Sequence, residues 1–161
     1  MYCVFDFLLY FSEQSIKHLF GCAGDEICQM SMKSEQGKYV SAMGYHDRYE
    51  ANVNAETIGS DEIWEVIFKG DGKVSLKGAH GRYMRWYGNR QNRQVKADAE
   101  KPNPWETFIV EDMGNGKLAF FQTNNRSKKK YYLVAGSDGS FTNQDAAEAG
   151  TTFEIVPAAG K

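Results

Sequence analysis

Residues 74–84 read Val-Ser-Leu-Lys-Gly-Ala-His-Gly-Arg-Tyr-Met, and this stretch decides the fold because its pattern recurs along the chain. Residues 30–40, Met-Ser-Met-Lys-Ser-Glu-Gln-Gly-Lys-Tyr-Val, match it position by position. A third, degenerate copy runs from Leu118-Ala119-Phe120-Phe121 to Lys129-Lys130-Tyr131-Tyr132-Leu133. Each copy contains one equivalent tyrosine. These are Tyr39, Tyr83 and Tyr132, which lie 44 and 49 residues apart and indicate an internal repeat.

The end of each unit recurs as well. Ile63-Trp64-Glu65-Val66-Ile67 ends the first unit, Pro104-Trp105-Glu106-Thr107-Phe108 the second, and Gly150-Thr151-Thr152-Phe153-Glu154 the third. Three units of about 45 residues therefore fill one domain over residues 26–157. We predict an N-terminal extension with a possible short helix over residues 1–25, and a C-terminal tail over residues 158–161.

Within each unit, short alternating runs are separated by hairpin-type turns such as Asp71-Gly72, Asn115-Gly116 and Asp138-Gly139. A chain of 161 residues with 10 Phe, 9 Tyr and 3 Trp can form an aromatic core, but one unit alone cannot. Three units that close on each other would bury a common core and remove exposed strand edges. The sequence therefore predicts an all-β domain of three repeats, the β-trefoil.

The motifs also carry a family resemblance. The pattern G-K-Y-V or G-R-Y-M, preceded by V-S-L-K and followed by P-W-E-x-F, resembles the fascin-like β-trefoil repeat. This resemblance implies actin-filament binding or cross-linking without enzymatic activity, and no cofactor. The third unit departs from the pattern, because Lys128-Lys129-Lys130 precedes Tyr132 and no tryptophan lies near Gly150. The framework aromatics are predicted to be core residues: Tyr39, Tyr83, Trp64, Trp105, Phe108 and Phe153.

Charge is distributed unevenly along the chain. The net charge is only −2, but residues 73–96 contain seven basic side chains and no acidic one, and residues 126–130 add four more. Such a dipolar chain attracts an acidic partner, such as an actin filament, through salt-sensitive contacts. The predicted contact residues are Lys73, Lys77, Arg85, Arg90, Arg93, Lys128, Lys129 and Lys130.

A carbohydrate-binding β-trefoil is the alternative hypothesis, with Asp138, Phe141 and Asn143 as one possible sugar-binding set in the third unit. An enzyme is not expected, because His18, His46 and His80 lie in separate segments without a nucleophile or metal-ligand spacing. The sequence contains no specific nucleic-acid motif, and no apolar run approaches the roughly 18 residues of a membrane-spanning helix.

Cysteines occur at three positions only, Cys3, Cys22 and Cys28, without a C-x-x-C spacing. An odd number suggests buried or free thiols and favours a reducing compartment. We therefore expect a cytoplasmic, cytoskeleton-associated protein. The apolar stretch Met1–Phe11 keeps secretion open as the alternative, although no Lys or Arg precedes it and Asp6 interrupts it.

Overall fold

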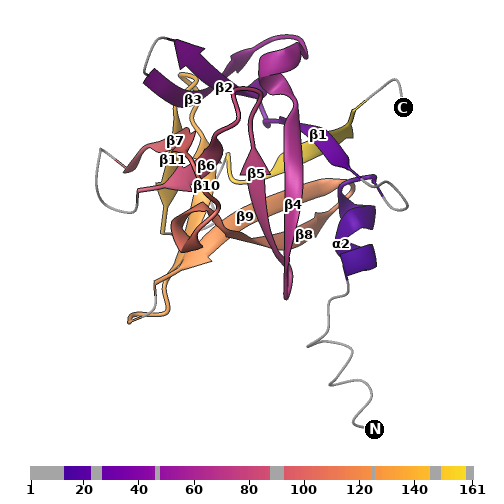
Figure 1. Cartoon of the computed structure of the whole chain (residues 1–161), viewed down its shortest axis with the longest axis vertical. Helices are drawn as coiled ribbons and strands as arrows, with labels where there is room; N and C mark the ends of the chain where they lie inside the picture. Colours follow the sequence, from indigo (N-terminus) through magenta and orange to yellow (C-terminus); the bar gives the residue numbers. More distant parts are fainter. Residues whose placement is uncertain are drawn as a thin grey trace, which may run out of the picture.

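Four strands build each of the three repeats in a computed structural model, which describes residues 13–22, 27–45, 48–87, 93–124, 126–145 and 150–158. The first repeat contains β1 (Cys28–Lys33), β2 (Tyr39–Tyr45), β3 (Arg48–Ala55) and β4 (Trp64–Gly70). The second contains β5 (Lys73–Lys77), β6 (Tyr83–Trp86), β7 (Val95–Ala99) and β8 (Phe108–Gly114). The third contains β9 (Lys117–Thr123), β10 (Lys130–Ala135), β11 (Phe141–Gln144) and β12 (Phe153–Pro157). Helix α2 (Glu13–Leu19) precedes them, and the 3-10 turns η1 (Ser60–Glu62) and η3 (Pro104–Glu106) lead into β4 and β8 (Figure 1).

The first and last strands of each repeat form a closed antiparallel barrel. Strand β1 pairs with β4 and β12, β5 pairs with β4 and β8, and β9 pairs with β8 and β12. The remaining strands form the hairpins β2–β3, β6–β7 and β10–β11. Strands β3, β7 and β11 contact one another, so the three hairpins form what we call the hairpin cap. This arrangement confirms the predicted β-trefoil.

A layer of equivalent aromatic residues fills the barrel. Trp64, Phe108 and Phe153 begin the last strand of each repeat, and all three are fully buried. Their cross-strand partners, Met30, Val74 and Leu118, are also equivalent and buried. Each repeat thus contributes one large aromatic and one aliphatic side chain to a common core, which no single repeat could enclose.

Three of the six predicted core aromatics are placed differently from the prediction. Trp105 is 45% exposed, because the barrel register aligns Phe108, not Trp105, with Trp64. Tyr39 and Tyr83 are half-buried, and an amino group covers each ring: Lys33 Nζ and Lys77 Nζ both lie 5.9 Å from the ring centroid. The Trp-Glu dipeptides of the two repeats are therefore not equivalent, whereas the Lys-Tyr pairs are.

A buried glutamate precedes the aromatic residue in the first two repeats. Glu62 accepts hydrogen bonds from the Gly59 amide (2.7 Å) and the Ser41 hydroxyl (2.6 Å). Glu106, at the equivalent position, accepts from the Asn103 amide (2.9 Å) and from Arg85 Nε (2.9 Å). Each carboxylate satisfies the first amide of its 3-10 turn and joins that turn to the second strand of the repeat.

The three repeats are joined by contacts that recur at each junction. At each junction, one side chain lies at the end of the first strand of a repeat or in the turn that follows it. This side chain contacts the segment just before the last strand of the preceding repeat. The contacts are Glu35 Oε2 with the Gly150 amide (2.7 Å) and Thr152 Oγ1 (3.1 Å), His80 Nε2 with Asp61 Oδ1 (3.2 Å), and Gln122 Nε2 with the Trp105 carbonyl (2.9 Å).

The β9–β10 hairpin of the third repeat is longer than its two counterparts. Phe121 pairs with Tyr132, as Lys33 pairs with Tyr39 in the first repeat, but two further cross-strand pairs extend the third hairpin. Figure 1 shows this orange hairpin projecting from the barrel. In its turn, Lys128 adopts a φ of 63°, a conformation that the first repeat gives to a glycine, Gly37.

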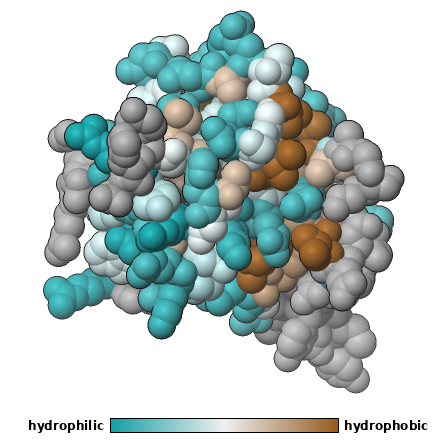
Figure 2. All heavy atoms as spheres, turned by 45° about the horizontal axis from the view of Figure 1, so that its top comes forward, coloured by the Kyte–Doolittle hydropathy of each residue, from teal (hydrophilic) through white to brown (hydrophobic). Residues whose placement is uncertain are grey.

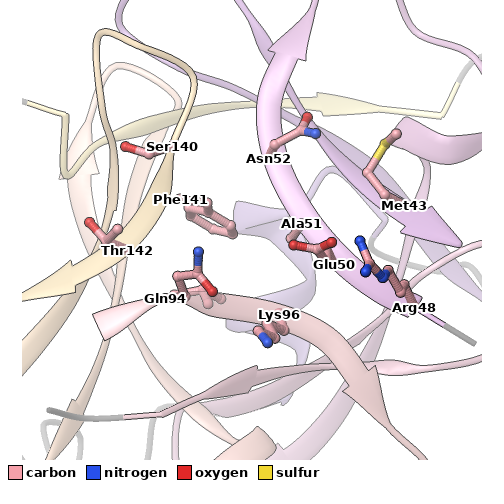
Figure 3. A pocket seen from close by; sticks show the side chains of 11 residues that line it. Met43, Arg48, Glu50, Ala51, Asn52, Gln94, Lys96, Ser140, Phe141 and Thr142 are labelled. Carbon is pink, nitrogen blue, oxygen red and sulfur yellow. The ribbon is translucent and has the colours of Figure 1, made fainter. Parts of the chain in front are cut away.

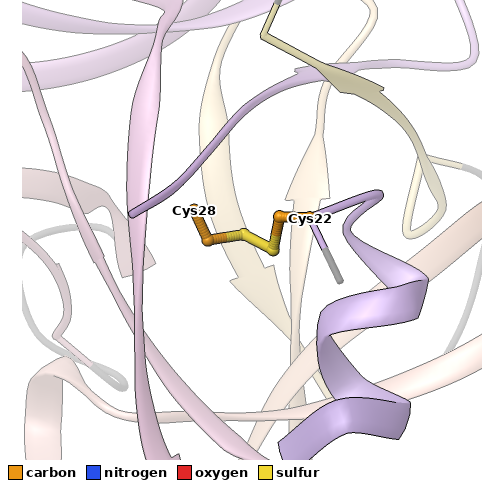
Figure 4. Close-up of a disulfide and its surroundings, with 2 residues drawn as sticks. All are labelled: Cys22 and Cys28. Atoms are coloured by element: carbon orange, nitrogen blue, oxygen red, sulfur yellow. A yellow bond between two sulfur atoms is a disulfide. The ribbon is translucent and has the colours of Figure 1, made fainter. Parts of the chain in front are cut away.

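Helix α2 packs on the barrel and is tied to it by a disulfide. Phe20 is fully buried, with its ring centroid 6.1 Å from those of Phe68 and Phe120. Cys22 and Cys28 form a disulfide between the segment after α2 and strand β1 (Figure 4). The interpretation of these two cysteines as free thiols was therefore wrong, while Cys3 lies outside the described residues. In the described part of the chain, no helix has the length and apolarity needed to cross a bilayer.

Replacing Arg85 with Ala should lower the free energy of unfolding by about 2–3 kcal/mol, because Glu106 would retain a buried carboxylate without its cation. Urea denaturation measures this loss, and adding Glu106→Gln to the variant should recover part of it. Lys128→Ala, at an exposed turn, is the control and should change stability by less than about 0.5 kcal/mol. An unchanged midpoint for Arg85→Ala would contradict the assignment.

Replacing both Cys22 and Cys28 with Ser should cost about 2 kcal/mol of stability, because the unfolded chain would lose a short covalent loop. Denaturation with and without a reductant measures the effect, since reduction should destabilise the natural chain and leave the double variant unchanged. The Cys3→Ser variant should respond to reductant as the natural chain does. If it does not respond, the disulfide is paired differently.

Candidate functional site: a pocket in the hairpin cap

A pocket of about 570 Å³ opens where the three hairpins of the cap meet. Met43, Arg48 and residues 50–52 of the first repeat, residues 94–96 of the second and residues 140–142 of the third contribute to its walls (Figure 3). This volume lies within the range of about 300–1,000 Å³ that is typical of small-ligand sites. We call this site the cap pocket.

The strand register divides the walls of the cap pocket into sets of equivalent positions. The apolar floor consists of one residue from each repeat: Ala51, Val95 and Phe141. These three positions are equivalent, because each pairs with the same position of the neighbouring strand, occupied by Ala42, Trp86 and Ala135. The residues on either side of the floor are polar in all three repeats. The preceding position holds Glu50, Gln94 and Ser140, and the following position holds Asn52, Lys96 and Thr142.

Several polar side chains of the cap pocket are not engaged within the protein. Arg48, Glu50, Asn52 and Gln94 make no side-chain hydrogen bond or ion pair with the residues that the structure describes. In Figure 3 their polar groups surround the opening between the hairpins. The site can therefore offer donors and acceptors to a ligand above an apolar floor, without first breaking internal contacts.

None of the residues around the cap pocket was singled out by a sequence motif, apart from Phe141. The pocket residues come from three repeats, and each repeat contributes only a short polar–apolar–polar triplet. The available signal was the alignment of these triplets, residues 50–52, 94–96 and 140–142, at equivalent repeat positions. To align the triplets, one must know the register of the β2–β3, β6–β7 and β10–β11 hairpins. The sequence did not reveal this register, because the third unit matches the other two poorly.

A second, smaller pocket of about 330 Å³ lies at the junction between the third and first repeats. Lys33, Glu35, Lys117 and Glu154 are among its lining residues. Glu35 already accepts hydrogen bonds from Gly150 and from the neighbouring Thr152, so it serves the repeat junction. One of the charged side chains that line this pocket is therefore already engaged within the protein.

The predicted basic contact residues have different surroundings in the structure. Lys73 begins β5 at the β4–β5 turn, and Lys77 lies at the other end of the strand over the Tyr83 ring. Arg85 is committed to Glu106 and to the Tyr87 hydroxyl, at 2.9 and 3.1 Å. Arg90 lies outside the described residues.

The other basic residues on this list gather near the projecting β9–β10 hairpin. Arg93 Nη1 lies 2.8 Å from Asp145 Oδ1, and Lys129 Nζ lies 3.9 Å from the other oxygen of the same carboxylate. Lys128 is exposed beside Lys129, and Lys130 Nζ lies 4.7 Å from the centroid of the Phe121 ring. The structure thus brings Arg93 to the basic turn at residues 128–130 and keeps Lys73, Lys77 and Arg85 in other surroundings.

Trp86 and Tyr87, which follow Arg85 in the sequence, are both half-buried. The Trp86 ring packs against Trp105 and Tyr131, with centroid distances of 6.3 and 5.2 Å. The Tyr87 hydroxyl donates to Asp98, and burial together with this hydrogen bond raises the pKa of Tyr87. Trp86 is therefore part of the packed junction between the second and third repeats, whereas the contacts of Tyr87 lie within the second repeat.

The sugar-binding set predicted in the third repeat does not converge on one surface. Phe141 is buried in the floor of the cap pocket, and the buried Asn143 donates to the Arg93 carbonyl at 3.0 Å. Asp138 lies in an exposed turn, where hydrogen bonds with Ser140 lower its pKa. Only Phe141 thus reaches a pocket.

Figure 2 shows the hydropathy of the described residues on one face of the protein. Most residues on that face are hydrophilic, and the hydrophobic ones form smaller patches between them. The concave, polar cap pocket is the better candidate for a ligand site.

No protein-family model matches the sequence, and no curated protein sequence is similar to it. Solved structures, in contrast, resemble it clearly. SeviL bound to an asialo-GM1 saccharide superposes with a TM-score of 0.61 and 14% identity, covering 82% of this chain and 98% of SeviL. The designed 3-fold symmetric protein ThreeFoil gives a TM-score of 0.63 and 14% identity, covering 80% of this chain and 97% of ThreeFoil. These similarities support the β-trefoil fold and not the fascin-like family, so the chain is placed by its fold alone.

Proposed function

We propose that this chain is a non-catalytic carbohydrate-binding module and that the cap pocket holds the sugar. The observation that carries this proposal is the set of unengaged polar side chains, Arg48, Glu50, Asn52 and Gln94, around an apolar floor. A pyranose ring matches this chemistry, because its hydroxyls donate and accept hydrogen bonds while its C–H groups pack on apolar atoms. Binding of this kind requires neither a nucleophile nor a general acid.

The fold comparison adds support, because SeviL has a similar fold and was solved with a bound saccharide. The disulfide between Cys22 and Cys28 supports an oxidising compartment for this module, such as the cell exterior, since disulfides are rare in the cytoplasm. Carbohydrate binding outside the cell would agree with both observations. The cytoplasmic location expected from the cysteine count has no comparable structural support.

An acidic macromolecule, such as an actin filament, is the second candidate partner. The observation that favours it is the basic turn at residues 128–130, which the longer β9–β10 hairpin carries away from the barrel (Figure 1). Arg93 lies close to this turn through Asp145, so two repeats contribute positive charge. Exposed charges of this kind give long-range but salt-sensitive attraction.

Glycan-array screening should identify saccharide ligands, and the double variant Asn52→Ala/Gln94→Ala should weaken binding to them by at least about tenfold, because two hydrogen-bonding groups would be lost. Isothermal titration calorimetry measures the change. Thr57→Ala, at an exposed loop position, is the matched control and should bind as the natural chain does. An array without hits, or full binding by the double variant, would exclude the cap pocket as a sugar site.

Co-sedimentation with actin filaments tests the second candidate. If the basic turn binds filaments, Lys128→Glu/Lys129→Glu/Lys130→Glu should abolish pelleting, and salt should weaken it, because the contact depends on charge. The control reverses three lysines elsewhere: Lys69→Glu/Lys101→Glu/Lys117→Glu carries the same net charge change. Absence of pelleting at low salt, or equal loss in both triple variants, would argue against a filament site at this turn.

A further inference from the structure

We propose that the ligand of the cap pocket is an acidic saccharide, a sugar carrying a carboxylate, and that each chain binds one such ligand. This inference rests on the proposed function, because it names the ligand class of the same pocket. Three features of the pocket carry it: the position of its charges, the chemistry of its neutral wall, and the asymmetry of its equivalent positions.

The charged groups of the cap pocket lie together on one side. Figure 3 shows Arg48, Glu50 and Lys96 on the side formed by the first two repeats. Among the described residues on this side, two are cations and one is a carboxylate, and Lys96 Nζ also lies 5.7 Å from the centroid of the Tyr87 ring. Arg48 has no carboxylate partner among the described residues, and an arginine guanidinium binds a carboxylate through two parallel hydrogen bonds. The carboxylate of a ligand would complete this pair.

The opposite wall of the pocket is neutral and suited to hydroxyl groups. Ser140 and Thr142 of the third repeat face the charged side across the floor in Figure 3. Their hydroxyls and the Gln94 amide can each donate and accept. Glu50 can accept hydrogen bonds from sugar hydroxyls with two oxygens. A sugar acid therefore matches the whole pocket, whereas a neutral sugar leaves Arg48 without its partner.

Equivalent positions around the pocket hold different side chains. Glu50, Gln94 and Ser140 are equivalent, and so are Asn52, Lys96 and Thr142, yet no two members of either set are identical. The backbone would allow three related ligand orientations, but the charges distinguish one of them. Because the three repeats share a single pocket, we infer one ligand per chain in one orientation.

Matched pairs of sugars test this inference by isothermal titration calorimetry on the full chain. Each pair consists of a methyl hexopyranoside and its uronic acid, in the galactose and glucose series. The uronate of at least one pair should bind with one-to-one stoichiometry and roughly tenfold more tightly than its neutral partner, because it adds a charge-assisted contact. High salt should reduce this preference.

Three variants locate the preference within the pocket. Arg48→Gln and Lys96→Gln should each lower the affinity for the uronate more than the affinity for its neutral partner, whereas Glu50→Gln should keep the ratio of the two affinities. Circular dichroism confirms that each variant is folded. Equal affinity for both members of each pair, a preference unchanged in Arg48→Gln and Lys96→Gln, or no binding of any of the four sugars would overturn the inference.

The outcomes also separate this inference from the proposed function. If neutral sugars bind in the cap pocket and their uronates bind no more tightly, only the acidic ligand class is wrong. If the Asn52→Ala/Gln94→Ala variant binds every array ligand normally, the pocket is not the sugar site, and both proposals fail.

Discussion

Antiparallel pairing between β1 and β12, the first and last strands of the barrel, is the constraint on which the rest of the structure depends. Residues 30–33 pair with residues 157–154, so the two ends of the domain hold each other in place. Only with this closure can Trp64, Phe108 and Phe153 meet in a common core. The recurring contacts between neighbouring repeats and the hairpin cap then follow, because each repeat has a fixed neighbour on both sides.

Most of the fold could be predicted from the sequence, because residues that determine the strands and turns recur at the same positions in the repeats. The spacing of Tyr39, Tyr83 and Tyr132 correctly aligned the first hairpin of every repeat. The alignment of Trp105 with Trp64 was wrong, because the Trp-Glu dipeptides of the two units occupy different positions in the barrel register. The equivalent residues are the buried Glu62 and Glu106, each followed two positions later by a core aromatic. The Cys22–Cys28 bond could not be predicted, since its formation depends on where α2 packs.

The candidate site was far less predictable, because basic residues that are close in the sequence can have different partners and lie in different surroundings in the folded chain. Arg85 belongs to a basic stretch of the chain, yet it serves the buried Glu106. Arg93 and Lys129 share Asp145, which lies far from either in sequence. The unengaged polar groups are found instead in the hairpin cap, where each repeat contributes one short triplet. Strand register, which determines these neighbours, is a property of the folded chain.

The longer β9–β10 hairpin has a consequence for how this domain tolerates insertions. Its two additional pairs place two extra residues in each strand, and side chains alternate between the faces of a strand with a period of two. Phe121 and Tyr132 form the same cross-strand pair as Lys33 and Tyr39 in the first repeat, so the two added pairs lie between this pair and the turn. Equal numbers of residues added to both strands beyond this pair lengthen the hairpin without shifting the register of the barrel strands, whereas unequal numbers would require a bulge or a longer turn. The β1–β2, β5–β6 and β9–β10 hairpins are thus positions at which insertions can add new surface to the barrel while its core stays unchanged.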